Sequence, residues 1–299
     1  MTFAERLASG PVLLLDGGMG SMLFARGLGA GESPEHWTLA RGSEVVAIHR
    51  AYVEAGSDAV QTNSFGAHPL RLAAAGLAGR ASEVARVSAA HARASAARYV
   101  IGDIGPTGEY LPPVGLGDAE EFRRGFTELG RAFAAAGVDA LHVETMSDLA
   151  EARSALAALL EAAPGIPVCV SLTFERRRRG FFTVMGDRLE EALPSLRDAG
   201  AAAVGANCTL ASADFLALAT TARSSCAGPL VFQPNAGAPR LEAGQAVYDQ
   251  TPEEFAADVA DIAAILGATG GAGAVGGCCG TDPRFIAALA AELARRGLR

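Results

Sequence analysis

The sequence has no apolar run that is long enough to cross a membrane as a helix. Its purely apolar stretches fall far short of the roughly 20 residues that a spanning helix needs. The opening residues, MTFAERLASG, carry an acid early and lack the basic and apolar regions of a secretion signal. We therefore expect a soluble, cytoplasmic protein with no membrane-bound part.

Positive charge and aromatic side chains are also scarce. The 299 residues include 25 lysine and arginine residues against 33 aspartate and glutamate residues, which gives a net charge of −8. Because phosphate binding needs a basic face, this balance argues against nucleic acid as the main partner, and against docking on an anionic membrane surface. Aromatic residues make up only 6% of the chain, so we expect an aliphatic, alanine-rich core.

The cysteines are odd in number, which argues against a disulfide framework. There are five of them, Cys169, Cys208, Cys226, Cys278 and Cys279. Thiols stay reduced inside a cell, so catalysis and metal binding are the roles open to any cysteine that is not simply buried. Two of the five are adjacent, in the glycine-rich stretch AVGGCCG at 274–280.

Short apolar runs alternate with longer amphipathic stretches along the chain. The runs predict strands at 12–18, 59–65, 99–106, 140–146, 167–174, 202–209, 230–237 and 274–280. The amphipathic stretches predict helices at 43–56, 81–97, 119–136, 147–162, 188–199, 212–225, 253–266 and 283–297. Continuous apolar runs are typical of parallel strands buried on both faces. The strict alternation predicts the α/β class and a (β/α)8 TIM barrel, formed by a single domain over residues 1–299.

A polar or glycine-rich cluster lies at the end of almost every predicted strand. In a barrel these carboxyl ends meet at one face, where active sites lie. Cys208 would reach this face from the sixth strand, and Cys278 and Cys279 would reach it from the eighth. Three thiolates suit Zn²⁺, which binds sulfur in a tetrahedral shell at about 2.3 Å, and three protein ligands leave the fourth position open, as in catalytic sites. Flanking glycines let the backbone bend so that consecutive side chains point at one ion.

The predicted zinc site favours thiol chemistry over hydrolysis. A zinc ion with three thiolates carries a net negative charge and is a poor Lewis acid, but a further thiolate bound there stays nucleophilic. Alkyl transfer to sulfur is therefore the reaction class that the residues indicate. A Cys-Cys pair alone is more often a buried or redox pair, and Cys208 is the residue that favours a metal. Cys169 and Cys226 are most simply packing residues.

Seven stretches of the sequence, spread over residues 12–286, carry a further signal. They are LLLDGGMGSML, PEHWTLARGSEVVAIHRAYVEAGSDAVQTNSFGA, GDIGPTGE, VETMSDLAEA, GANCT, QPNAGAP and GGCCGTDPRFI. Together, and in this order, they resemble the homocysteine S-methyltransferase family of zinc-dependent (β/α)8 barrels. The stretches GDIGPTGEYLPPVG and PNAGAPRLEAGQAVYDQTPEEFAADV are most similar to the homocysteine-binding module of cobalamin-dependent methionine synthase.

The resemblance implies a set of site residues. The zinc ligands it implies are Cys208, Cys278 and Cys279. The residues it implies for the amino and carboxylate ends of homocysteine are Asp16, Gly17, Gly18 and Glu144. Thr145 could add a hydroxyl contact or cap the next helix. No catalytic side chain is expected beyond the metal site. Taken alone, Asp16 could instead cap the loop after the first strand, and Glu144 could pair with an arginine inside the barrel.

The resemblance also implies a function, the transfer of a methyl group to the sulfur of zinc-bound homocysteine to give methionine. The donor stays open between S-methylmethionine, a betaine-like compound and a methyl-corrinoid protein. One alternative is a homocysteine-binding subunit that works only with a separate corrinoid (methylcobalamin) protein, and another is methylation of a different small thiol. A phosphate-binding barrel lyase or oxidoreductase is less favoured, because Arg284 is the nearest basic residue to the eighth-strand loop.

Other residues at the predicted rim have weaker signals. The aromatic residues best placed to cage a donor cation are Trp37, Phe65 and Tyr110, although Trp37 could equally be core. The stretch ERRRRG at 175–180 predicts a solvated loop rather than a partner-docking site. His142 is the one histidine expected near Glu144. The rim amides are expected to tie loops together, and they are Asn63, Asn207, Gln233 and Asn235.

Overall fold

Eight parallel strands form the central sheet of the computed structural model, which describes residues 1–29, 31–242, 245–267 and 273–299. The strands are β1 (Leu13–Leu14), β2 (Ala59–Gln61), β3 (Tyr99–Ile104), β4 (Ala140–Met146), β5 (Val168–Leu172), β8 (Ala203–Ala211), β9 (Leu230–Asn235) and β12 (Gly273–Val275). Their order in the sheet is β1-β12-β9-β8-β5-β4-β3-β2, so successive central strands are neighbours. Each overlaps a predicted strand.

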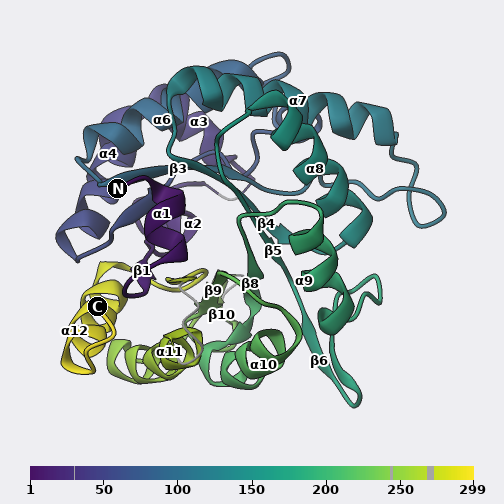
Figure 1. Ribbon diagram of the computed structural model, residues 1–299. Coiled ribbons are helices and arrows are strands. Elements are labelled where there is room, and N and C mark those ends of the chain that lie inside the picture. The colour runs from purple at the N-terminus through teal and green to yellow at the C-terminus, as the bar shows by residue number, and fades with distance from the viewer. Residues whose placement is uncertain (30, 243–244, 268–272) are drawn as a thin grey trace.

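The ring closes between β1 and β2 through two aspartates. The backbone N–H of Asp58 donates to Leu14 O at 2.7 Å, and its carboxylate accepts from the N–H of Leu14 at 3.0 Å. The carboxylate of Asp16 accepts from the N–H of Gln61 at 2.9 Å. With helices around the outside (Figure 1), this arrangement confirms the predicted (β/α)8 TIM barrel.

The outer helices correspond to the eight predicted ones. They are α4 (Gly42–Glu54), α6 (Ala81–Ala94), α7 (Ala119–Ala136), α8 (Leu149–Ala162), α9 (Leu189–Asp198), α10 (Ser212–Ser225), α11 (Pro252–Gly267) and α12 (Pro283–Arg295). Helix α8 begins two residues later than predicted, because Asp148 caps it by accepting from the N–H of Ala150 at 2.7 Å. In the described part of the chain, no helix is both long and apolar enough to cross a membrane.

Several short elements are absent from the sequence prediction. They are α1 (Phe3–Ala8), α2 (Met19–Ala25), α3 (Pro34–Ala40), α5 (Pro69–Ala74), and the hairpins β6 (Glu175–Arg177) with β7 (Gly180–Phe182) and β10 (Arg240–Glu242) with β11 (Gln245–Val247). The ERRRRG stretch lies in the first hairpin, so the predicted loop is wrong. Its arginines are solvated as expected, and Arg176 pairs with Asp214 at 3.2 Å.

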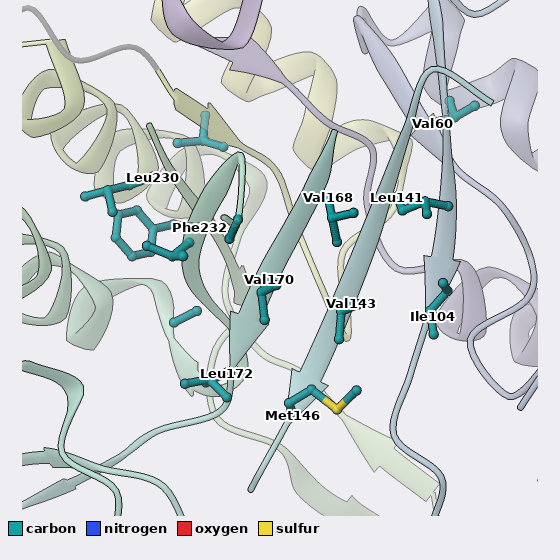
Figure 2. Close-up of a cluster of buried hydrophobic side chains, with 14 of the residues drawn as sticks. Val60, Ile104, Leu141, Val143, Met146, Val168, Val170, Leu172, Leu230 and Phe232 are labelled. Atoms are coloured by element: carbon teal, nitrogen blue, oxygen red, sulfur yellow. The ribbon is translucent and has the colours of Figure 1, made fainter. Parts of the chain in front are cut away.

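The side chains of the central strands alternate between two cores. Figure 2 shows Val168, Val170 and Leu172 of β5 in the core that lies between the sheet and the helices. Cys169 belongs to a second cluster, formed by the first residues of the strands together with Phe3 and Leu7 of α1. Helix α1 therefore closes the amino end of the barrel, and the carboxyl end is left for a site. Both Cys169 and Cys226 are buried, as predicted.

Strands β8 and β9 approach each other closely at Gly205 and Val231. A β-carbon on Gly205 would lie 1.7 Å from the carbonyl oxygen of Val231, so Gly205→Ala should lower the free energy of unfolding by about 3 kcal/mol. Gly267→Ala is the control, because a β-carbon there meets nothing within 4 Å. Urea unfolding measures both variants, and equal midpoints would contradict the packing described here.

Candidate active site

A cavity of about 340 Å³ lies at the carboxyl end of the barrel. Its lining includes all eight residues that the sequence predicts for the site, Asp16, Gly17, Gly18, Glu144, Thr145, Cys208, Cys278 and Cys279. They come from the ends of β1, β4, β8 and β12, so the barrel brings together residues that are far apart in the sequence. A larger, more open groove between α6 and α7 contains none of them.

The three cysteine sulfurs meet on one side of this cavity. The Sγ atom of Cys279 lies 3.8 Å from that of Cys208 and 3.9 Å from that of Cys278. All three sulfurs lie within 4.8 Å of one another, and all three cysteines are free thiols. Bonds of about 2.3 Å to a tetrahedral zinc ion would place its sulfur ligands about 3.8 Å apart. The spacing of the thiols therefore fits a zinc ion.

Strained backbone aims two of the site residues. Thr145, Cys208 and Thr209 have φ values of 60°, 59° and 54°, in the left-handed region that non-glycine residues rarely adopt. The pairing registers of β4 and β8 also shift at these positions, between Val143 and Met146 and between Asn207 and Ala211. Such bulges re-aim side chains next to active sites. They end the regular strands here and turn the Cys208 thiol into the cavity.

Asn207 connects the two irregular strand ends. Its Oδ1 accepts from the N–H of Thr145 at 2.8 Å, and its Nδ2 donates to Thr145 Oγ1 at 2.7 Å and to Glu144 Oε2 at 3.3 Å. The side chain is fully buried. The expectation that rim amides tie loops together is correct for Asn207, but it missed that the tie also orients Glu144. Thr145 does not cap α8, since Asp148 does.

Glu144 is a mostly buried carboxylate, with 12% of its side chain exposed, and it is held by amides. Gln61 Nε2 donates to its Oε2 at 3.0 Å, and no arginine of the described residues pairs with it, so the alternative of an arginine pair is wrong. Burial raises the pKa of Glu144 to about 7. His142 Nδ1 lies 3.9 Å from the same oxygen. Burial lowers the pKa of His142 to about 3, so this histidine is neutral and the contact is not an ion pair.

The Asp16–Gly17–Gly18 turn packs against the loop that follows β12. A β-carbon on Gly17 would lie 2.7 Å from Thr281 Oγ1, and one on Gly18 would lie 2.6 Å from Cys278 O. The N–H of Gly18 donates to Thr281 Oγ1 at 3.0 Å. The Asp16 carboxylate bonds to β2 rather than capping the loop after β1, which rules out that alternative. Burial raises the pKa of Asp16 well above its usual value.

The three thiols differ in acidity in the metal-free protein. Hydrogen bonds from Cys278 and Cys279 lower the pKa of Cys208 to about 3. The same hydrogen bonds raise the pKa of Cys278, and raise that of Cys279 to about 12. One thiolate supported by two thiols is the charge state that this geometry favours. Cys169, which lies outside the cavity, differs from Cys208, because burial raises the pKa of its thiol to about 12.

The expectation that rim amides tie loops together is also confirmed for Asn235 and Gln233. Asn235 Oδ1 accepts from the N–H of Cys279 at 3.1 Å, and Gln233 Nε2 donates to Gln61 Oε1 at 2.7 Å. Asp103, at the end of β3, lines the cavity as well. The sequence analysis did not name Asp103, although its position in GDIGPTG, near the carboxyl end of a predicted strand, was an available signal.

The predicted aromatic cage is not formed. Phe65 lines the cavity, but Trp37 and Tyr110 are not among the lining residues. Trp37 is buried in the core, where its Nε1 donates to Glu32 at 3.1 Å. Tyr110 lies in the long loop after β3, and its hydroxyl is 3.4 Å from that of Ser147. A place in the cage is therefore wrong for Trp37 and Tyr110, and the alternative that Trp37 belongs to the core is confirmed.

Comparisons with known proteins agree on one family. The family model described as homocysteine S-methyltransferase matches residues 13–293. The chain is 32% identical over 301 residues to methionine synthase of Mycobacterium tuberculosis, covering 95% of this chain and 25% of that protein. It is 32% identical over 260 residues to methionine synthase of Mycobacterium leprae, covering 83% of this chain and 21% of that protein. The chain thus spans a quarter or less of the length of these relatives.

A solved structure gives the same result. The fold is similar to the metallated form of the homocysteine methyltransferase MmuM from Escherichia coli, with a TM-score of 0.76 and 26% sequence identity. The match covers 94% of this chain and 96% of that one.

The unequal thiol acidities generate a labelling prediction. In chelator-treated, reduced protein at about pH 6, iodoacetamide should modify Cys208 at least about tenfold faster than Cys169 or Cys226, because the thiolate is the nucleophile. Peptide mass spectrometry after timed quenching measures the three rates. Cys208→Ser should remove the fast phase. Similar rates at all three positions would show that Cys208 is not the acidic thiol.

Proposed function

The chain belongs to the homocysteine S-methyltransferase family, whose members are methyltransferases, and we propose that it methylates the sulfur of homocysteine to give methionine. The observation that carries the proposal is the placement of the three thiols in one cavity with the Glu144 carboxylate. The thiol of homocysteine suits the site of the three cysteine sulfurs, and its ammonium suits the Glu144 carboxylate. A cavity of about 340 Å³ suits a small amino acid.

Cys208, Cys278 and Cys279 are proposed to hold Zn²⁺. Their sulfur spacings of 3.8 Å and 3.9 Å match a tetrahedral shell. The ion supplies one kind of chemistry when bound, lowering the pKa of a fourth, incoming thiol while its sulfur remains nucleophilic. Asn235 fixes the backbone of Cys279, and Asn207 sets the strand end that bears Cys208. The chain thus orients the sulfurs before any substrate arrives.

Glu144 and the turn after β1 are proposed to hold the amino acid end of homocysteine. The Glu144 carboxylate would accept from the ammonium, a charge-assisted contact that is strong in a buried site. Because Gly18 already donates to Thr281, Gly17 is the better placed of the two glycines to donate to the substrate carboxylate. Asp16 supports this turn through its bond to β2, and Thr145 lies beside Glu144 with its hydroxyl bonded to Asn207.

A second candidate function is favoured by the similarity to methionine synthases. In this alternative the chain binds and activates homocysteine, and methylates it only when a separate corrinoid protein brings the methyl group. A donor screen separates the two functions. Purified, zinc-loaded protein is incubated with homocysteine and S-methylmethionine, betaine or methylcobalamin, and methionine is measured by mass spectrometry. Turnover with a small donor supports the first function, and turnover that requires a corrinoid protein supports the second.

Loss of a zinc ligand should remove both metal and activity. Cys208→Ser or Cys279→Ser is expected to lose bound zinc and to lower methionine formation at least about 100-fold, because two thiolates hold the ion poorly. Plasma mass spectrometry gives the zinc content per chain. The matched control is Cys226→Ser, a buried cysteine that does not line the cavity, which should keep both. Full zinc stoichiometry in Cys208→Ser would end the assignment.

Neutralising Glu144 should separate substrate binding from metal binding. Glu144→Gln is expected to weaken homocysteine binding by about 10- to 100-fold, since it removes a charged hydrogen-bond acceptor, while zinc stays bound. Isothermal titration of the zinc-loaded protein measures the affinity. Glu109→Gln, an exposed position on the loop after β3, is the control. Unchanged homocysteine affinity in Glu144→Gln would refute the role in holding the ammonium.

A further inference from the structure

The cavity is lined by acidic side chains and, among the described residues, by no basic ones. Three of its lining residues are carboxylates, Asp16, Asp103 and Glu144. Among the described residues that line it, none is an arginine or a histidine, and the chain contains no lysine at all. The nearby His142 is neutral, because burial lowers its pKa to about 3. The cysteines hold one thiolate in the metal-free protein and would supply three around a bound zinc ion. When the three carboxyl groups are ionised, a single zinc ion and a single ammonium do not balance this set.

Asp103 is the carboxylate that has an oxygen without a hydrogen-bond partner. It is 6% exposed, and its Oδ1 is buried without a hydrogen-bond partner. In comparison, Asp16 accepts from Gln61 N, and Glu144 accepts from Gln61 Nε2. A buried carboxylate without a partner is costly unless a ligand supplies a positive charge or a proton. Burial and the nearby Glu144 and Asp16 raise the pKa of Asp103.

The backbone around Asp103 is fixed, so the position of its carboxylate is defined. The N–H of Asp103 donates to Thr62 Oγ1 at 2.9 Å, and its carbonyl accepts from Ser64 Oγ at 2.8 Å. Thr62 and Ser64 are buried and lie 2.6 Å apart through their hydroxyls. These contacts lock the end of β3 to the segment after β2. The carboxylate, with its unpartnered Oδ1, is therefore built into the cavity wall.

The methyl-transfer reaction offers a second cation beyond the ammonium of homocysteine. Sulfonium and quaternary ammonium donors carry their positive charge on the atom that bears the methyl group. Homocysteine loses its thiol proton to solvent on binding, its sulfur forms a bond to the methyl carbon, and the donor's carbon–heteroatom bond breaks. The bonding pair stays on the heteroatom, which becomes neutral. Charge complementarity to Asp103 is therefore present before the transfer and absent after it.

We propose that Asp103 forms a cation subsite that selects a small onium compound as the methyl donor. This inference rests on the methyl transfer proposed above. Phe65 supplies an apolar wall to the same cavity. The guanidinium of Arg71 lies 5.1 Å from the centroid of the Phe65 ring. Arg71 itself lines a neighbouring groove. The cavity, about 340 Å³ in volume, encloses a small donor but not a corrin ring. Asp103 acts on the donor's ground state, so its effect should appear in KM.

The first test uses binding and needs no turnover. Betaine and its carbon isostere 3,3-dimethylbutanoate share a carboxylate and a shape, but only betaine has the onium charge. Zinc-loaded, homocysteine-bound wild-type protein should bind betaine at least about tenfold more tightly, as measured by isothermal titration. The preference should collapse in Asp103→Asn and persist in Glu109→Gln. Equal binding of the two compounds to the wild type would overturn the proposal without any variant.

The second test uses turnover with S-methylmethionine, betaine and methylcobalamin. In Asp103→Asn the KM for whichever onium donor reacts should rise at least about tenfold, while kcat, zinc content and homocysteine affinity stay within about twofold of the wild type. An unchanged KM for the onium donor would overturn the subsite, as would turnover confined to methylcobalamin. Failure of the wild type to bind homocysteine would instead contradict the proposed function itself.

Discussion

The hydrogen bonds of Asn207 are the constraint on which the geometry of the cavity depends. They join the carboxyl ends of β4 and β8, where three residues adopt left-handed backbone conformations. Each such conformation costs about 1–3 kcal/mol and persists only where surrounding contacts hold it. A fully buried amide with partners on both its oxygen and its nitrogen provides this support. Without the hydrogen bonds of Asn207, no other contact described here would hold the Cys208 and Glu144 side chains toward the same cavity.

The apolar packing in the rest of the barrel confines the polar groups to one end. Helix α1 and an apolar cluster fill the amino end, so the polar groups are confined to the carboxyl end, where the strands finish. Burial there raises the pKa values of the carboxyl groups of Asp16 and Glu144. The protein therefore holds groups that gain from a cation before a ligand binds, which is the preorganisation that binding and catalysis use.

The sequence was sufficient for the barrel and for the convergence of the cysteines. Buried parallel strands have a strong apolar signal, and the strand ends alone place Cys208 beside Cys278 and Cys279. Short helices such as α2 and α5 were not predicted, because six or seven residues show too little periodicity.

Asp103, and the part that Asn207 plays in orienting Glu144, were missed for a different reason. A polar residue at a strand end can be a ligand, a tie or a solvated group, and only distances and burial distinguish these roles. For Trp37 the sequence left the cage and the core open, and its core position follows from how α3 packs. The strained backbone at Cys208 and Thr209 could not be predicted from the sequence either, because neither residue with a positive φ is a glycine.

The central claim is that three cysteines hold a zinc ion whose fourth position takes the sulfur of homocysteine. X-ray absorption at the zinc edge tests it most directly. The account predicts three sulfur ligands at about 2.3 Å in the zinc-loaded protein, rising to four when homocysteine is added. A shell with fewer than three sulfurs, or one that homocysteine leaves unchanged, would contradict it.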